Sequence, residues 1–469
     1  MTQNTNPARG MRDFLPDDVR RREYVVSIIK DVYQKYGFEP LETPSVENIE
    51  TLMGKYGEEG NGLIFKILER GAGALEGKTD LALRYDLTVP TARVVAEYKD
   101  KLPRIFKRYQ IQPVWRADRP ARGRYREFYQ CDVDVFGTKS LVVEAELCAA
   151  VSEVLKRLNF EDFIIRINHR KLLTGILDFA GVLPENQNDA LVVIDKLDKI
   201  GNEGVFNELV ERGIPEKVST KLIEFFKQAA DFPIKMKAVI DYEVSRSPDE
   251  SGLLKRQNEA INTAWLKESR EILADSQNAQ EGLDDIEKIL NFVGKDVYPQ
   301  IRIDPSLARG LSYYTGAIVE INVPDLTGSI CGGGRYDNLI GMFSGQEIPA
   351  CGFSLGLERI ILVMTERGMF PEHLTRAPAD VLVTIWNEDT IGDSLALAND
   401  LRAQGLRVSV YPEADKIGKQ LKYAASLGIP AVAIVGDDER ANNSVTIKYL
   451  ESGNQETIAR DNLATELKI

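Results

Sequence analysis

Basic, aromatic and acidic residues are concentrated in one stretch of the sequence, residues 101–137. Its first part, KLPRIFKRYQIQPVWRADRPARGRYR, contains nine lysines or arginines and one acidic residue, with four aromatic residues interleaved. In the second part, EFYQCDVDVFG, strand alternation places four side chains on one face: Phe128, Gln130, Asp132 and Asp134. A basic strand-loop-strand that is followed by carboxylates indicates a binding site for a ligand with both an anionic and a cationic part. A solvated, charged hairpin is the alternative.

The glycine clusters do not match the common nucleotide-binding loops. GAGALEG (71–77) has the wrong spacing for the dinucleotide fingerprint and is typical of a mobile loop. No G-x-x-x-x-G-K-[ST] motif occurs, which excludes a P-loop ATPase. GGGRYD (332–337) either lets the backbone approach a ligand closely or forms a turn beside a bulge, and the pattern alone leaves both open.

Histidines and cysteines are too few for several kinds of site. His169 ends an apolar run and is expected to be structural, and His373 lies in a proline-flanked stretch that resembles a linker. A histidine-based triad or metal site is therefore not expected. The four cysteines show no C-x-x-C spacing, so we expect buried thiols in a reducing compartment rather than zinc ligands or disulfides: Cys131, Cys148, Cys331 and Cys351.

The overall composition is that of a globular protein. The chain has 469 residues, 43% of them hydrophobic, and a net charge of −13. Such a chain is not a general binder of polyanions, so a nucleic-acid partner must be bound by a local basic patch. The N-terminus has no apolar run of the kind found in secretory signals, and no run approaches 18 apolar residues. We expect a soluble, cytoplasmic protein without a membrane anchor.

The elements that must position these residues follow from periodicity. Apolar residues at three-four spacing predict a helix that begins at Pro16 and ends before Gly37, and a second helix near 141–159. Residues 172–300 have a helical, acidic pattern that indicates a separate insert. A strand pattern returns at 301, and 365–379 is typical of a linker. Beyond it the pattern alternates β-α-β-α-β, which predicts a small α/β domain.

Five motifs occur in a fixed order: RYDLTVPTARVV (84–95), WRADRPARGRYREFYQCDVDVFG (115–137), ARGLSYYTG (308–316), GGGRYDNLI (332–340) and GFSLGLERI (352–360). Together they resemble the class II aminoacyl-tRNA synthetases, and within that class the histidyl-tRNA synthetase family. GMRDFLP near the N-terminus resembles the start of the same family. The resemblance covers the chain from about residue 8 to the end. It departs at Ser312, where the family usually carries an acidic residue.

The resemblance implies an α+β fold, with an antiparallel sheet flanked by helices. The catalytic domain would comprise residues 1–172 and 301–366, with a helical insertion domain at 173–300 and an anticodon-binding domain at 377–469. Lys416, Lys419 and Lys422 would then share one helix face and contact phosphates. A merely solvated helix face is the alternative. An obligate homodimer is also implied.

The implied reaction has two steps: ATP activates histidine as histidyl-adenylate, and the histidyl group then moves to tRNA(His). The resemblance assigns catalysis to three arginines. Arg116 would bridge the carboxylate and the α-phosphate, Arg309 would lie near the α-phosphate, and Arg359 would contact the γ-phosphate. Asp118 and Arg124 would complete the ATP site. Mg²⁺ is expected to arrive with ATP, without a metal site built by the protein.

The resemblance also assigns the histidine pocket. Asp86, Thr88 and Gln130 would surround the α-amino group, with Leu87 as their neighbour. Asp134 and Tyr314 would contact the imidazole, and Tyr313 would line the pocket, which Arg116 and Arg309 complete. For the tyrosines, plain core packing is the alternative.

Two other functions remain open at this stage. One is a non-catalytic, histidine-sensing paralogue that regulates ATP phosphoribosyltransferase. Such paralogues usually lack the anticodon domain and the ATP-binding residues, whereas both are present here. The other is an RNA-binding module without catalysis, which would leave Gln130 and Asp134 unexplained.

Overall fold

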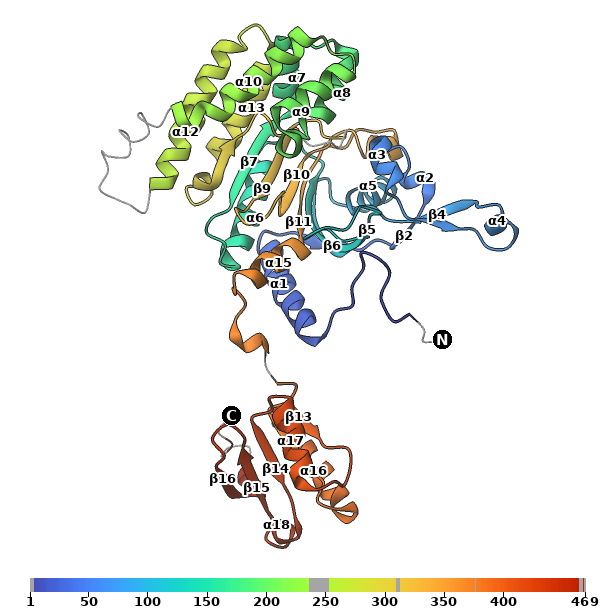
Figure 1. The fold of residues 1–469 in the computed structure, drawn as a ribbon, viewed down its shortest axis with the longest axis vertical. Helices are drawn as coiled ribbons and strands as arrows, with labels where there is room; N and C mark the ends of the chain where they lie inside the picture. The colour runs from blue at the N-terminus through green and yellow to red at the C-terminus, as the bar shows by residue number, and fades with distance from the viewer. Residues whose placement is uncertain (1–3, 236–252, 309–312, 376, 464–466, 468–469) are drawn as a thin grey trace. The chain divides into compact units, whose positions relative to one another are not determined.

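A computed structural model describes residues 4–235, 253–308, 313–375, 377–463 and 467. The chain forms two compact units, Met1–Met369 and Phe370–Ile469. Figure 1 shows the elements of both units.

An eight-stranded sheet is the centre of the first unit. In spatial order its strands are β1 (Glu39–Pro40), β5 (Phe106–Trp115), β6 (Glu127–Phe136), β11 (Ala350–Gly356), β10 (Cys331–Arg335), β9 (Ala317–Asn322), β7 (Ile164–His169) and β8 (Ile301–Ile303). The interior pairs are antiparallel, and only the outermost pairs, β1–β5 and β7–β8, are parallel. The predicted antiparallel sheet flanked by helices is confirmed.

Three helices cover one face of this sheet (Figure 1). α1 (Pro16–Lys35) packs against α6 (Val142–Arg157) and α15 (Leu357–Glu366). α6 contacts both β11 and β6, and α15 contacts β6. The apolar stripe expected in the first helix is buried: Val25, Ile28, Ile29, Val32 and Tyr33. The apolar side chains of β6, Cys131, Val133 and Val135, are buried too. This apolar layer leaves the opposite side of β6 to its polar residues.

A smaller sheet adjoins the start of α5 (Thr88–Glu97). Its order is β2 (Val46–Asn48), β4 (Thr79–Leu83) and β3 (Lys66–Leu68), with the short helices α2 (Ile49–Leu52) and α3 (Gly57–Gly62) in the connections. The GAGALEG stretch, expected to be a loop, contains one helical turn, α4 (Ala72–Leu75), between β3 and β4.

Helices connect β7 to β8, as the sequence pattern predicts. They are α7 (Arg170–Ala180), α8 (Gln187–Ile194), α9 (Leu197–Glu211), α10 (Glu216–Lys235), α12 (Leu253–Ile272) and α13 (Gln277–Phe292), with the 3-10 turns η1 (Pro184–Asn186) and η3 (Tyr298–Gln300). α13 packs against α7, α6 and β7, so the bundle shares the core of the first unit. α14 (Gly341–Ser344) precedes β11, and η4 (Glu372–Thr375) follows α15 in the chain.

His169 joins the sheet to this bundle. Its Nδ1 accepts a hydrogen bond from the backbone N–H of Lys171 (3.2 Å), which caps α7, and its Nε2 lies 3.5 Å from Asp285. Burial lowers the pKa of His169 to about 3, so the ring is neutral. The geometry is that of a structural histidine.

The second unit has the predicted β-α-β-α-β alternation. It runs β12 (Val381–Val383), η5 (Glu388–Thr390), α16 (Ile391–Ala403), β13 (Val408–Val410), α17 (Ile417–Ser426) and β14 (Ala431–Ile434), followed by α18 (Asp437–Ala441), β15 (Ser444–Tyr449), β16 (Gln455–Ala459) and η6 (Arg460–Asn462). The sheet order is β13-β12-β14-β15-β16. Its first three strands are parallel and the last two are antiparallel additions. Lys416 precedes α17 as its N-cap, so only Lys419 and Lys422 lie on the helix itself.

Two simpler expectations are also tested by the structure. All four cysteines are buried and unbridged, as predicted. Within the part of the chain that the structure describes, no helix has the length and apolar character needed to cross a lipid bilayer.

Candidate active site

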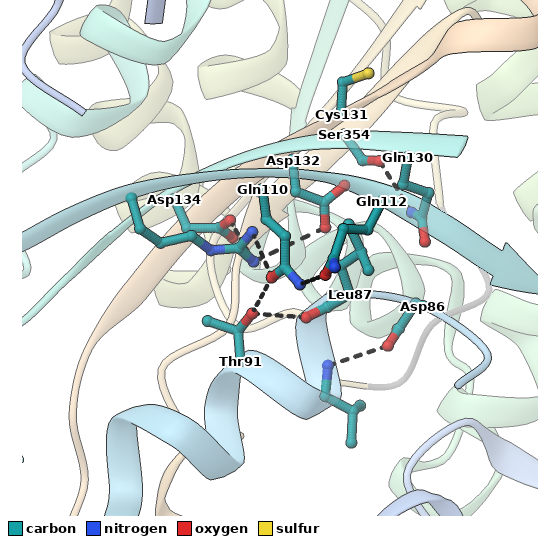
Figure 2. A network of polar contacts seen from close by, with 12 residues as sticks. Asp86, Leu87, Thr91, Gln110, Gln112, Gln130, Cys131, Asp132, Asp134 and Ser354 are labelled. Atoms are coloured by element: carbon teal, nitrogen blue, oxygen red, sulfur yellow. Dashed lines mark hydrogen bonds and ion pairs between the residues drawn. The ribbon is translucent and has the colours of Figure 1, made fainter. Parts of the chain in front are cut away.

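A patch of buried polar residues lies on the sheet face opposite α1. Strand register aligns Arg108, Gln110 and Gln112 of β5 with Asp134, Asp132 and Gln130 of β6, and these with Gly352, Ser354 and Gly356 of β11. We call these nine residues the polar face. Charged residues are rarely this deeply buried unless they are paired or functional. Figure 2 shows the β6 members side by side along their strand.

Asp134 is held by two side chains, one from β5 and one from the residue that follows β10. Its Oδ2 lies 2.8 Å from Nη2 of Arg108, and its Oδ1 accepts a hydrogen bond from the hydroxyl of Tyr336, directly after β10. A Cβ at Gly352 would stand 1.7 Å from Oδ1 of Asp134, so only glycine fits opposite this carboxylate. Burial raises the pKa of Asp134 and Arg108 lowers it. The carboxylate is therefore fixed in position before any ligand arrives.

A hydrogen-bond network extends from this pair across β5. Nη1 of Arg108 donates to Oε1 of Gln110 (3.3 Å), and Nε2 of Gln110 donates to Oε1 of Gln112 (2.6 Å). The same Gln112 oxygen accepts from Nη1 of the buried Arg84 (3.0 Å). The hydroxyl of Thr91 in α5 donates to the carbonyl of Leu87 (2.7 Å) and lies 3.1 Å from Gln110 (Figure 2). The network connects the polar face to the start of α5.

The RYDLT segment supplies a second buried carboxylate. Asp86 accepts hydrogen bonds from the hydroxyl of Tyr56 (2.9 Å) and from the backbone N–H of Val89 (3.0 Å). Burial raises its pKa, while the Val89 N–H and the charge of Arg116 lower it. Leu87 is buried as the N-cap of α5, and Thr88 begins the helix half-buried.

Gln130 belongs to the polar face and also lines the cleft that adjoins it. Its Nε2 donates to Oγ of Ser354 (2.9 Å), which fixes the orientation of the amide. Its Oε1 is buried, and no donor among the described residues reaches it. A buried acceptor without a donor is costly, so the atom marks a place where a ligand can donate.

Next to Gln130 is a cleft lined by cations. Its lining includes Arg116, Asp118, Arg124, Phe128, Gln130, Ser354, Glu358 and Arg359. The guanidinium of Arg116 donates from Nε to the carbonyl of Tyr85 (3.0 Å) and lies 4.2 Å from the centre of its ring. Arg359, in the first turn of α15, donates to the carbonyls of Gly123 (3.4 Å) and Ser329. Two arginines predicted to bind phosphate therefore line the same cavity.

The remaining predicted residues lie around these two features. Nη1 of Arg124 is 3.5 Å from Asp118, in an exposed pair. Tyr313 and Tyr314 are buried, and the ring of Tyr313 is 6.0 Å from that of Tyr336, which binds Asp134. Arg309 and Ser312 lie outside the described residues.

No cluster of three or more potential metal ligands is found among the described residues. The two carboxylates that line the cleft are already engaged: Glu358 by Nη1 of Arg22 (3.0 Å) and the backbone N–H of Tyr129 (2.9 Å), and Asp118 by Nη1 of Arg124 (3.5 Å). The donor set of the cleft therefore does not fit a resident divalent cation.

Sequence reasoning missed four residues of the site: Tyr56, Arg108, Tyr336 and Ser354. Tyr336 belongs to the GGGRYD motif, so the motif itself carried the signal. Arg108 is in a strand that pairs with the carboxylate strand, but only the register identifies its partner. No sequence pattern connects Tyr56 with Asp86.

Comparison with known proteins gives a consistent picture. A family model described as Histidyl-tRNA synthetase matches residues 10–360, and one described as Anticodon binding domain matches residues 380–468. A protein of Porphyromonas gingivalis named Histidine--tRNA ligase is 41% identical over 98% of both chains. Another of that name, from Gloeobacter violaceus, is 42% identical over 96% of this chain and 95% of its own. A crystal structure of histidyl-tRNA synthetase from Nostoc sp. PCC 7120 matches with a TM-score of 0.76 and 31% identity over 99% of each chain.

Proposed function

The chain belongs to the histidyl-tRNA synthetase family, and from this premise we propose how its residues divide the work. It is an enzyme that ligates histidine to tRNA through a histidyl-adenylate, with ATP as the activating substrate. Histidine, ATP and tRNA are accordingly its ligands.

In the proposed adenylation step, the arginines of the cleft neutralise the approach of two anions. Arg116 bridges the histidine carboxylate and the α-phosphate, and Arg359 contacts the γ-phosphate. Their convergence on one cavity supports this assignment. Guanidinium groups suit phosphoryl oxygens because their planar donors are fixed in direction. Arg309 joins them near the α-phosphate on the strength of the family motif alone.

Asp118 and Arg124 complete the proposed ATP site. Both line the cleft, and they contact each other across its edge. Mg²⁺ enters with ATP as part of the substrate, since the described residues offer no cage of ligands for it. Its role is to neutralise the departing diphosphate.

Histidine lies, in this proposal, along β6. Asp86, Thr88 and Gln130 bind its α-amino group beside Leu87. Asp134 and Tyr314 bind the imidazole, with Tyr313 at the pocket wall. The observation that carries the proposal is the buried Oε1 of Gln130, which no donor among the described residues reaches and which belongs to a residue shared by the polar face and the cationic cleft. A site built from such acceptors rejects apolar analogues strongly, because binding them would leave buried acceptors unpaired.

We propose the domain boundaries that the sequence indicates. Residues 1–172 and 301–366 form the catalytic domain, 173–300 the helical insertion domain, and 377–469 the anticodon-binding domain. Lys416, Lys419 and Lys422 contact tRNA phosphates. The enzyme acts as a homodimer in the cytoplasm.

The regulatory alternative is less well supported. A histidine sensor needs neither the phosphate-binding arginines nor the second unit, and both are present here. The relatives of Porphyromonas gingivalis and Gloeobacter violaceus, which match over at least 95% of both chains, are named as ligases.

Diphosphate exchange into ATP, driven by each of the twenty amino acids in turn, tests the proposal. We expect exchange with histidine alone, because only histidine satisfies both ends of the pocket. Histidine binding without exchange would instead support a sensor.

A further inference from the structure

Asp132 is a buried carboxylate to which nothing above assigns a role. It lies between Gln130 and Asp134 on the same side of β6, with only 2% of its surface exposed (Figure 2). Its cross-strand neighbours are Gln110 on β5 and Ser354 on β11. Burying an aspartate at the centre of a sheet costs folding free energy unless its charge is paired and hydrogen-bonded.

The partners of Asp132 are weaker than those of Asp134. Its Oδ2 is 3.9 Å from Nη2 of Arg108, beyond hydrogen-bond distance, whereas Oδ2 of Asp134 is 2.8 Å from the same nitrogen. The Oδ1 of Asp132 is buried, and no described residue donates to it. The Oδ1 of Asp132 is therefore able to accept a hydrogen bond from a ligand.

Charge is also unbalanced at this position. Six other titratable groups act on Asp132 and Asp134 from the surrounding elements. They are Tyr33 of α1, Asp86 before α5, Arg108 of β5, Cys131 of β6, Tyr336 after β10 and Cys351 of β11. Burial keeps the tyrosines and cysteines neutral, and Asp86 has Arg116 as its countercharge. Asp132 and Asp134 are thus left with one guanidinium, that of Arg108, in the described part of the chain.

Burial and the neighbouring Asp134 raise the pKa of Asp132, against the lowering effect of Arg108. Two carboxylates that share one cation bind a further proton or cation readily. The ligand proposed for this face brings an imidazole ring. A neutral ring has one N–H donor and one acceptor nitrogen, so if both carboxylates contact the ring nitrogens, the acceptor nitrogen faces a carboxylate oxygen. A protonated ring has two N–H donors and a positive charge.

We propose that Asp132 is a further histidine-binding residue, and that Asp132 and Asp134 together hold the imidazole of the substrate in its protonated, two-donor form. The inference rests on the proposed function, because it assumes that histidine lies along β6. Above the ordinary imidazole pKa of about 6.5, free histidine carries a neutral ring. Binding must then take one proton from solvent: enzyme, neutral-ring histidine and a proton combine into one complex.

Titration calorimetry of the full-length protein with L-histidine tests this directly. Binding enthalpies measured in buffers of different ionisation enthalpy give the number of protons exchanged. We expect uptake of about one proton per site at pH 8.5, where the imidazole ring of free histidine is neutral, and less uptake near pH 6, where part of it is already protonated. Histidine binding without proton uptake at pH 8.5 would overturn the proposal.

The variant Asp132→Asn keeps the shape of the side chain and removes its charge. We expect proton uptake to be lost and the KM for histidine in exchange to rise at least tenfold, with the KM for ATP unchanged. Asp100→Asn, at an exposed position, is the matched control and should leave all three values unchanged. An Asp132→Asn protein with normal proton uptake and normal KM would also overturn the proposal.

The two proposals fail in different ways. Absence of histidine-driven exchange in the unmodified protein would contradict the proposed function itself. Normal exchange accompanied by zero proton uptake would contradict only the role of Asp132. If Asp132→Asn does not fold, the calorimetry of the unmodified protein still decides.

Discussion

The charged side chains of the polar face in the first unit are buried, whereas the lysines around α17 in the second unit are exposed to solvent. Arg108 is fully buried and contacts Asp134 and Gln110, and each of these has further partners. Lys419 is exposed and forms an ion pair with Asp415, four residues before it, at 2.9 Å. Lys416 and Lys422 are also exposed.

This difference separates two kinds of inference. A buried charge must be compensated, so its neighbours constrain what it does, and a missing partner points to a ligand. An exposed lysine costs little to leave in water, and surface ion pairs contribute about 0–1 kcal/mol. Removing one positive charge in each region therefore has very different expected effects.

The largest effect is expected at Arg108. Arg108→Gln leaves two buried carboxylates without a countercharge, which lowers the free energy of unfolding by about 3–5 kcal/mol at pH 8. The loss should shrink toward pH 5, because the raised pKa values of Asp132 and Asp134 allow protonation to replace the guanidinium. Chemical denaturation at the two pH values measures it. The exposed Arg104→Gln serves as control, and equal losses in both variants would remove the contrast between buried and exposed charge.

Arg116 is an intermediate case in this comparison, because its side chain lines the cleft and is half-buried. Arg116→Ala should slow histidine-driven diphosphate exchange by about 100- to 1000-fold, since its proposed target is charge that develops in the transition state. The variant should also lower the free energy of unfolding, because it removes the countercharge of the buried Asp86. Exchange at the normal rate would rule out the assigned role.

The smallest effect is expected at the second unit. Lys416→Ala and Lys422→Ala should each raise the KM for tRNA in aminoacylation about two- to fivefold, and lower its dependence on salt, as expected for single phosphate contacts. Diphosphate exchange, which needs no tRNA, should be unchanged. Lys448→Ala, on β15 of the same unit, is the matched control. A KM for tRNA insensitive to both substitutions would favour the alternative of a solvated helix face.

Much of the fold was predictable from local patterns. The first helix is defined by its apolar spacing and Pro16, and the second unit by its alternation of strands and helices. Period-two alternation also predicts that Gln130 and Asp134 share a face, because that depends on one strand alone. These features need no knowledge of distant contacts.

The partners of the site were not predictable in this way. In the sequence, Arg108 cannot be distinguished from the other basic residues of the charged stretch. Only the strand register shows that it lies opposite Asp134. The residues between β5 and β6 do not fix that register, because their number is compatible with several pairings. Tyr56 and Asp86 are brought together only by the packing of the smaller sheet. Long-range pairing therefore decides which polar residues work together.

The central position of β6 has a consequence for how the molecule responds to heat. β6 has a hydrogen-bonded strand on either side and is buried over most of its length, so its backbone amides should exchange with deuterium only in the largest opening events. Residues 60–75 carry more exposed surface and should open first. On warming, β6 with Gln130 and Asp134 would then stay ordered after that neighbouring segment has opened.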